Sequence, residues 1–214
     1  MPNCPLCHSS NIQPYSRDKH RHYLSCQQCQ LVFVPAEQHL CAEQEKAEYD
    51  LHQNEVNDPG YRRFLSRLYL PLAERLPTGA EGLDFGCGPG PALAAMFREV
   101  GYPVSLYDCF YQPDLGALQK SYDFIVATEV VEHLSQPGLE LRRLWERLKP
   151  GGWLGVMTKL VIDQAAFQQW HYKNDMTHIC FFSRTTFNWL AKQWGATVEF
   201  VGTDVILLRK PATE

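Results

Sequence analysis

The sequence predicts an α/β domain with a mainly parallel sheet, preceded by a small metal-binding segment. An apolar run from Gly82 to Phe85 leads into three alternating glycines and then an amphipathic stretch, so a strand, a tight loop and a helix are expected. Strand-like and helical stretches continue to alternate after it, as in a parallel sheet covered on both faces. Near the N-terminus, two C-x2-C pairs stand eighteen residues apart.

Length and composition limit the classes of protein that remain. The chain has 214 residues and a hydrophobic content of 45%, enough for one core with a small appendage. No apolar run approaches the ~20 residues of a membrane span, and no signal-like segment precedes Cys4, so the cytoplasm is the expected compartment. A net charge of −4 gives no large basic field, so nucleic acid is disfavoured as a partner.

The first segment, residues 1–35, is predicted to be a small ribbon that holds a structural zinc ion. Its two C-x2-C knuckles supply four thiolates for a closed tetrahedral site. Eight cysteines without a secretory signal favour metal ligation or free thiols over disulfides. The segment is too short and too polar to bury a core, so a metal would contribute most of its folding free energy. The predicted zinc ligands are Cys4, Cys7, Cys26 and Cys29.

The segment after the ribbon is predicted to be helical. Its composition favours a helix over residues 36–48 and a loop over residues 49–60. In residues 61–76 the apolar side chains recur at three-and-four spacing, which predicts a helix with one face that needs a partner. Tyr49 and Tyr61 are assigned to ordinary packing, with the mouth of a ligand site as the alternative role.

The glycine loop after the first strand of the second domain predicts a nucleotide-type binding site. Glycines allow positive φ and close approach of a ligand to the backbone, and the next helix offers unpaired N–H groups at its N-terminus. A P-loop would need Lys-Ser/Thr after the last glycine, where Pro91 and Ala92 stand. A dinucleotide site would need G-x-G-x-x-G, which the spacing from Gly86 to Gly90 does not match.

The run from Asp84 to Gly90 resembles the (D/E)-x-G-x-G-x-G motif of class I S-adenosylmethionine-dependent methyltransferases. The resemblance extends over residues 79 to 210 and implies a Rossmann-like sheet and an enzyme that uses this cofactor. Two further marks of the family follow in order. Leu148 to Gly152 form the L-K-P-G-G sequence before a strand, and a hairpin over residues 197–208 gives the antiparallel last strand.

The resemblance also implies which residues bind the cofactor. Asp108 ends the second strand, where a carboxylate accepts both hydroxyls of a ribose; the alternative is an aspartate that only stabilises a turn. Thirteen residues separate Asp108 from the strand that begins at Tyr122, so the third strand of the family is expected to be short or missing. The implied cofactor-binding residues are Asp84, Gly86, Cys87, Gly88, Gly90, Asp108, Thr128 and Glu129.

The strand from Tyr122 to Val130 runs into a Glu-Val-Val-Glu-His sequence at the carboxyl edge of the expected sheet, where ligands bind. It resembles the E-x-x-E-H of methyltransferases that act on quinone hydroxyls and on small-RNA 2′-hydroxyls, where it holds a divalent cation. Glu129, Glu132 and His133 are therefore candidates for a second cation site. The alternative is a His133 that only fixes the loop.

Residues 159–182 are predicted to form a lid that selects the acceptor, since long aromatic loops after a strand often do so. His178 is the first candidate for a general base, with Asp175 orienting its ring and His171 as the second candidate. The alternative is that His178 only anchors the loop. The predicted catalytic residues are His178, His133 and Glu129.

The combined prediction is a methyltransferase that acts on a small-molecule oxygen or nitrogen nucleophile by direct displacement. Most of the acceleration would come from aligning nucleophile, methyl carbon and sulfonium at ~3 Å. The alternatives are an RNA or protein methyltransferase that uses the ribbon for recognition, supported by residues 17–22, and a non-catalytic cofactor-binding protein. The predicted segments are the ribbon (1–35), a helical linker with lid helices (36–78) and the methyltransferase domain (79–214).

Overall fold

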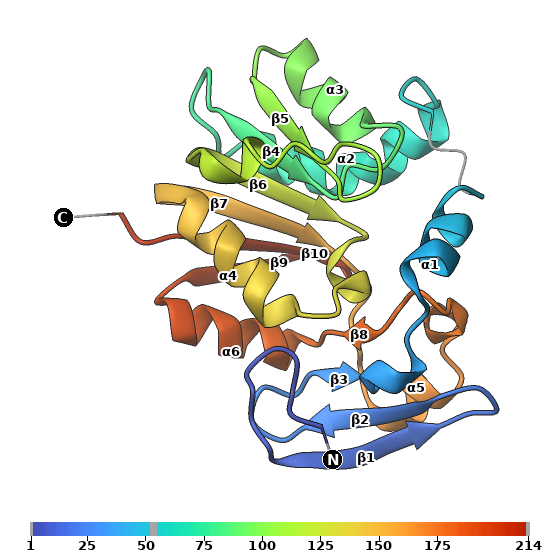
Figure 1. Ribbon diagram of the computed structural model, residues 1–214. Coiled ribbons are helices and arrows are strands. Elements are labelled where there is room, and N and C mark those ends of the chain that lie inside the picture. Colours follow the sequence, from blue (N-terminus) through green and yellow to red (C-terminus); the bar gives the residue numbers. More distant parts are fainter. Residues whose placement is uncertain (1, 52–54, 213–214) are drawn as a thin grey trace.

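The computed structural model describes residues 2–51 and 55–212, so residues 52–54 of the predicted loop lie outside the described part. Figure 1 shows a central twisted sheet with helices on both faces and a second, smaller sheet packed below it. None of the helices in the described residues is both long and apolar enough to cross a membrane.

The larger sheet confirms the predicted topology. In the described residues its strand order is β5-β4-β6-β7-β10-β9, with β5, β4, β6 and β7 parallel and β10 antiparallel to both its neighbours. The outer edge of β5 has no strand partner there, and the short helix η2 (Ala117–Gln119) packs beside it, so the expected third strand is missing. The strands are β4 (Gly82–Phe85), β5 (Val104–Tyr107), β6 (Tyr122–Thr128), β7 (Leu148–Met157), β9 (Thr197–Val201) and β10 (Val205–Arg209).

Four helices cover the two faces of this sheet. Helices α2 (Pro59–Ala73) and α3 (Ala92–Glu99) pack on one face, where α2 buries three leucines that follow its three-and-four spacing. Helices α4 (Pro137–Arg147) and α6 (Arg184–Trp194) pack on the other face. Helix α6 begins where the Ser183 hydroxyl accepts the Thr186 N–H, as a serine at the N-cap of a helix typically does.

The smaller sheet joins the ribbon to the second domain. Strands β1 (Ile12–Arg17), β2 (His22–Cys26) and β3 (Val32–Phe33) belong to the ribbon, whereas β8 (Cys180–Phe181) comes from the predicted lid. The pairing of β3 with β8 is antiparallel and places Val32 opposite Phe181. The lid is therefore partly ordered by the ribbon, and it also holds the short helices α5 (Gln164–Gln168) and η4 (His171–Asn174).

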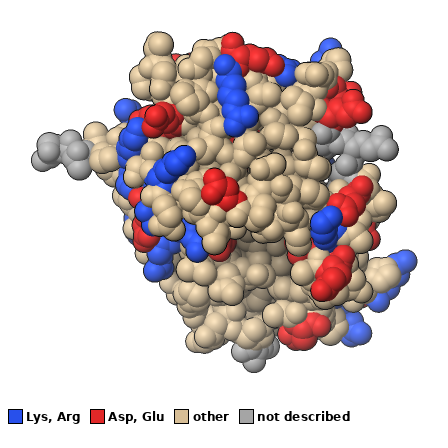
Figure 2. All heavy atoms as spheres, turned by 45° about the horizontal axis from the view of Figure 1, so that its top comes forward, with Lys and Arg blue, Asp and Glu red and all other residues tan. Residues whose placement is uncertain are grey.

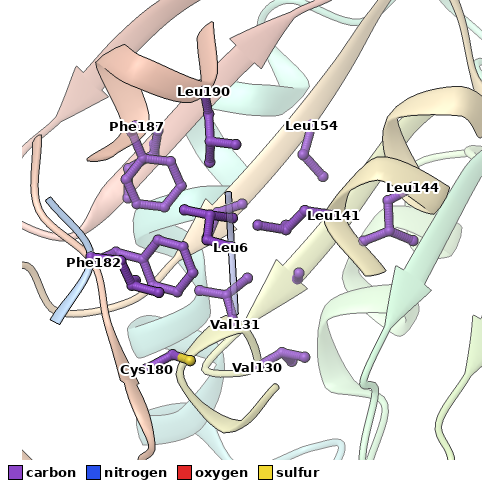
Figure 3. Close-up of a cluster of buried hydrophobic side chains, with 14 of the residues drawn as sticks. Leu6, Val130, Val131, Leu141, Leu144, Leu154, Cys180, Phe182, Phe187 and Leu190 are labelled. Carbon is purple, nitrogen blue, oxygen red and sulfur yellow. The ribbon is translucent and has the colours of Figure 1, made fainter. Parts of the chain in front are cut away.

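A leucine of the first knuckle also joins the two parts. Leu6 is 4% exposed and lies in Figure 3 among Val131, Leu141 and Leu190 of the second domain. Beside it, the Gly138 N–H at the start of α4 donates to the Pro5 carbonyl at 3.2 Å. Burial of a leucine side chain stabilises a fold by about 1.5–3 kcal/mol, so one continuous core holds the ribbon in place.

The linker is helical as predicted, but in two pieces. The single helix expected over residues 36–48 is broken into η1 (Ala36–Gln38) and α1 (Ala42–Tyr49), with an extended backbone between them. Helix α1 buries none of its residues fully and crosses the carboxyl ends of the central strands. It forms one wall of the cavity described below.

Candidate functional site

A cavity of about 760 Å³ lies at the carboxyl ends of β4, β5 and β6. The glycine loop forms its floor, α1 forms one wall and the C-terminal part of the lid forms another. Tyr49 and Tyr61 both line it, so the role given above as their alternative is the one that the structure supports. The aromatic side chains of its walls are Tyr49, Tyr61, Phe64, Phe85, Tyr107, Phe110 and Tyr111.

Two glycines of the loop are needed for different reasons. Gly86 and Gly88 both have positive φ, at 74° and 62°. A Cβ on Gly86 would stand 2.5 Å from a methyl carbon of Val130, so packing alone excludes a side chain there. A Cβ on Gly88 would meet no atom of the described residues within 4 Å. Gly88 therefore leaves open space at the cavity, which is the close approach that a ligand requires.

Asp84 and Gly90 lie behind the loop and are not among the described residues that line the cavity. Asp84 is fully buried, and burial raises the pKa of its carboxyl to about 7, although the Ala94 N–H donates to it. The Gly90 carbonyl accepts the Ala92 N–H at 2.7 Å. Both residues therefore support the loop from inside, and their predicted contact with the cofactor stays a prediction.

Asp108 ties the glycine loop to the turn after β5. Its Oδ2 accepts the Gly88 N–H at 2.9 Å, and its Oδ1 accepts the N–H groups of Phe110 and Tyr111 at 2.9 and 3.1 Å. The turn-stabilising role given as an alternative is thus present, and the carboxylate still lines the cavity beside Gly88. A ligand that reaches Gly88 also reaches Asp108.

Cys87 and Thr128 line the cavity as well. Burial raises the pKa of the Cys87 thiol to about 12, so this side chain stays a neutral thiol at physiological pH. The Thr128 hydroxyl is buried and has no hydrogen-bond partner among the described residues. A buried hydroxyl without a partner is uncommon and costs free energy, so the Thr128 hydroxyl is available to a polar group of a ligand in the cavity.

A tyrosine that the sequence did not single out links the two carboxylates after β6. The Tyr172 hydroxyl forms a short hydrogen bond to Glu132 and lies 3.2 Å from Glu129. Burial raises the pKa of both carboxyl groups, that of Glu132 to about 8 with the neighbouring Glu129 charge adding to the effect. The backbone of Glu129 is left-handed, with φ at 52°, and its N–H donates to the Met157 carbonyl. Sequence spacing alone gave no signal for Tyr172.

The two predicted catalytic histidines meet at the cavity. Their ring centroids are 4.7 Å apart. The Nδ1 of His178 lies 2.6 Å from the Tyr172 carbonyl, and the Nδ1 of His133 lies 3.1 Å from the Thr177 carbonyl. Because a carbonyl only accepts, each Nδ1 carries the hydrogen. A neutral His178 therefore has its lone pair on Nε2.

The group that hydrogen-bonds the His178 ring is the Tyr172 carbonyl, whereas Asp175 lies farther away. The Nε2 of His178 is 3.7 Å from the Asp175 carboxylate, beyond hydrogen-bond distance. Asp175 instead accepts the N–H and the hydroxyl of Thr177. Burial lowers the pKa of His178, and the nearby Asp175 charge opposes that effect only in part. His171 does not line the cavity, and its Nε2 lies 3.1 Å from the Lys159 amine.

The candidate cation ligands differ from the predicted set in one member. Ligand atoms of Glu132, His133 and His178 lie within 4.8 Å of one another, and Glu129 is not part of this group. The reason is the lid, which brings His178 beside Glu132 from a remote part of the chain. Glu132 keeps one buried oxygen without a partner among the described residues. Both histidines donate Nδ1–H to carbonyls, as metal-ligating histidines usually do, so the donor set fits a divalent cation.

The four cysteines of the ribbon form a second cluster. Their Sγ atoms lie within 4.8 Å of one another, with 3.5 Å between Cys4 and Cys29 and 3.4 Å between Cys7 and Cys26. Tetrahedral zinc with Zn–S bonds of about 2.3 Å needs sulfurs about 3.8 Å apart, so the spacing fits with a small expansion.

The two knuckles repeat the same backbone turn. In each, the residue after the second cysteine is left-handed, with φ at 61° for His8 and 60° for Gln30. Each of these residues donates its N–H to the carbonyl of the first cysteine of its knuckle, at 2.9 Å in both. Backbone N–H groups also donate to the sulfur of Cys4. Both turns therefore direct sulfurs and N–H groups inward, as a thiolate site requires.

The matched family agrees with this geometry. A family model described as a methyltransferase domain matches residues 58–200 of the chain. The chain belongs to the methyltransferase domain family. This confirms the predicted class I fold and the predicted class of enzyme, an S-adenosylmethionine-dependent methyltransferase. No curated protein sequence matches the chain.

Solved methyltransferase structures have the same fold at low sequence identity. The 1,6-didemethyltoxoflavin-N1-methyltransferase of Burkholderia thailandensis, with its substrate and S-adenosylhomocysteine bound, has a TM-score of 0.55 at 16% identity, over 93% of this chain and 99% of that one. A complex of the Haloferax volcanii Trm112 methyltransferase activator with a methyltransferase gives a TM-score of 0.54 at 14% identity, over 81% of this chain and 95% of that one. A Bacillus halodurans methyltransferase gives 0.52 at 18%, over 64% and 67%.

Proposed function

We propose that this methyltransferase transfers a methyl group from S-adenosylmethionine to a neutral or cationic small molecule that carries an oxygen or nitrogen nucleophile. One observation carries the proposal. The cavity has Gly88 and Asp108 on one side and His133 and His178 on another, and no lysine or arginine is among the described residues that line it. It therefore offers a place for a nucleoside, a basic imidazole and a wall without anion-binding groups.

The cofactor fits the side of the cavity formed by the glycine loop. The open space at Gly88 admits the nucleoside close to the backbone, and the adjacent Asp108 carboxylate accepts ribose hydroxyls. The cationic sulfonium is attracted by the carboxylates of this cavity, which lowers the free energy of binding. The roles of Asp84 and Gly90 are then indirect, because they hold the loop that the nucleoside contacts.

The walls favour a small acceptor over a nucleic acid. Five carboxylate side chains of the described residues line the cavity and would repel a phosphodiester. The segment of residues 17–22, which supported an RNA substrate, has one of its basic residues buried, because Arg21 is 1% exposed. On the face drawn in Figure 2, basic and acidic side chains are interspersed with wide uncharged areas. The five acidic residues of the cavity are Glu45, Asp108, Glu129, Glu140 and Asp175.

The reaction is a single displacement in which His178 accepts a proton. A lone pair of the acceptor oxygen or nitrogen attacks the methyl carbon, the carbon–sulfur bond breaks and its electrons remain on sulfur, which gives S-adenosylhomocysteine. The proton of the nucleophile passes to Nε2 of His178, the nitrogen that the Tyr172 carbonyl leaves unprotonated. The lowered pKa of His178 keeps this ring neutral before the reaction.

A second candidate role for the same cluster is a divalent cation held by Glu132, His133 and His178. The buried, unpartnered oxygen of Glu132 favours it. Such a cation would polarise an acceptor hydroxyl and lower its pKa. Elemental analysis separates the two roles, because a bound cation would be lost in Glu132→Gln and kept in Glu129→Gln. If the purified protein holds no metal besides that of the ribbon, His178 acts as the base alone.

The ribbon is proposed to bind one structural zinc ion through its four cysteines. The support is the twin turns, the mutual spacing of the sulfurs and the burial of three of the four thiols. The closed set of four ligands leaves no position for a substrate, so the metal stabilises the fold and takes no part in methyl transfer.

Calorimetry with S-adenosylhomocysteine, followed by methyl transfer to a panel of phenols, amines and N-heterocycles, tests the proposed function. We expect saturable binding of the product and turnover with at least one neutral or cationic member. His178→Gln should lower the rate by about 10²–10⁴, the usual range for a lost base. His171→Gln is the matched control and should leave the rate unchanged. Binding without turnover across the panel, or equal rates for both variants, would contradict the proposal.

A further inference from the structure

An arginine of the ribbon is buried under the lid. Arg21 stands in the turn between β1 and β2 and is 1% exposed, which is rare for a side chain that always carries a charge. The turn that presents it is fixed by Asp18, whose Oδ1 accepts the N–H groups of His20 and Arg21 at 2.8 and 2.9 Å. The guanidinium is thus directed away from the ribbon and into the second domain.

The guanidinium binds four backbone carbonyls of one lid segment. Nη1 donates to the carbonyls of Met176 and His178 at 3.1 and 2.8 Å. Nη2 donates to the carbonyl of Asp175 at 2.9 Å and, through a short bond, to that of Lys173. The segment of residues 173–178 is therefore wrapped around one planar cation, whose fork of donors suits several acceptors at once.

Hydrogen bonds connect His178 both to Arg21 and to the residue that precedes the wrapped segment. The His178 carbonyl is bound by Arg21, and its Nδ1–H is bound by the carbonyl of Tyr172, the residue that precedes the wrapped segment. Removal of the guanidinium would leave four inward-facing carbonyls without that donor, and buried carbonyls without a donor are costly. The segment would then have to turn its carbonyls outward and move Tyr172 relative to His178.

We propose that Arg21 is a positioning residue for the active site: it shapes residues 173–178 so that His178 is held in the Nδ1–H form, with Nε2 facing the reaction. The ribbon is then a structural part of the acceptor site rather than a separate recognition module. The consequence for His178 rests on the proposed function, whereas the effect of Arg21 on the imidazole does not.

The positioning role of Arg21 can be tested without a substrate, by measuring which ring nitrogen of His178 carries the hydrogen. In water a free imidazole of histidine favours Nε2–H, so an Nδ1–H form in the protein is imposed by its surroundings. Long-range ¹H–¹⁵N spectra of the imidazoles distinguish the two forms in the full-length protein, recorded where His178 is neutral. The variants are Arg21→Gln and Arg21→Lys. Arg17→Gln removes the same charge from an exposed position of the same hairpin and is the matched control.

We expect Nδ1–H at His178 in the unmodified protein and in Arg17→Gln. In Arg21→Gln the ratio of the two forms should shift about fivefold or more towards Nε2–H, since one net hydrogen bond to the ring is lost. Arg21→Lys should shift part of the way, because a lysine has no planar fork. Zinc content and S-adenosylhomocysteine affinity serve as folding checks and should stay within about twofold of the unmodified protein.

An unchanged His178 spectrum in a folded Arg21→Gln protein would overturn the proposal. If that variant does not fold, Arg21→Lys is judged by the same criterion. An Nε2–H form in the unmodified protein would overturn it without any variant. A failure of the proposed function gives a different result. The protein would then bind no S-adenosylhomocysteine, while the ratio of the Nδ1–H and Nε2–H forms of His178 would still change in Arg21→Gln.

Discussion

The Gly88→Ala substitution separates what the backbone needs from what the cofactor needs. Gly88 has φ at 62° and Gly202, in the hairpin between β9 and β10, has φ at 63°; within 4 Å, a Cβ on either would meet no atom in the part of the chain that the structure describes. An alanine costs about 1–2 kcal/mol in the left-handed region, so both variants should lose that much free energy of unfolding. For a chain of this size, 1 kcal/mol lowers Tm by about 2–4 °C.

Of Gly88 and Gly202, Gly88 is the one that lines the cavity, so the methyl group of Gly88→Ala competes with the nucleoside and that of Gly202→Ala does not. Overpacking costs about 1–3 kcal/mol, which weakens S-adenosylhomocysteine binding by about 5- to 150-fold in Gly88→Ala. Thermal unfolding and titration calorimetry on both variants measure the two effects. Equal affinity in Gly88→Ala and Gly202→Ala would refute the assignment of the glycine loop to the cofactor.

Three further predictions concern the metal, the pH dependence and the interface. Cys26→Ala should lose the single bound zinc and unfold the ribbon, whereas Cys41→Ala should retain the metal in elemental analysis. The pKa of Asp84 is about 7 in the folded protein and 3.8 ordinarily, so the folded state binds this proton more tightly. The free energy of unfolding should therefore fall between pH 4 and 7, and less so in Asp84→Asn; parallel curves from denaturant titrations would contradict this. A Cβ on Gly138 would stand 2.3 Å from the Leu6 carbonyl oxygen, so Gly138→Ala should destabilise the docked ribbon by about 1–3 kcal/mol and expose it to limited proteolysis.

The parts of the fold that depend on local spacing were predictable from sequence. The strand, glycine loop and helix around Gly88 follow from short-range preferences, and so do the zinc knuckles and the final hairpin. The missing third strand followed from chain length alone, because thirteen residues after Asp108 cannot hold two helices and a strand. Each of these features is decided within about twenty residues of chain.

The contacts between the ribbon and the lid were not predictable in this way. Arg21 contacts carbonyls more than 150 residues away in sequence, and no periodicity marks such a pair. The pairing of Val32 with Phe181 belongs to the same class of contact. The hydrogen bond from the His178 ring to the backbone carbonyl of Tyr172 was not predicted for a similar reason, since such a carbonyl carries no sequence signature. Hydrogen bonds to backbone groups become visible only in the fold.

The structure bears on the role of the ribbon, which the sequence left open. From sequence, a zinc ribbon before a methyltransferase domain suggests either a recognition module or a structural one. In the fold, Leu6 enters the core of the second domain and β3 pairs with the lid. The linker helix α1, which follows the ribbon, supplies Tyr49 to the cavity. Removal of residues 1–35 would therefore damage the site as well as the interface.

The position of the bound cofactor decides the roles of Gly88, Asp108 and His178, and a crystal structure with S-adenosylhomocysteine measures it directly. We expect the ribose hydroxyls against Asp108, the nucleoside over Gly88, and the sulfur on the side of the cavity that contains His178. Ligand bound elsewhere, or residues 173–178 occupying the space beyond the sulfur, would contradict this expectation.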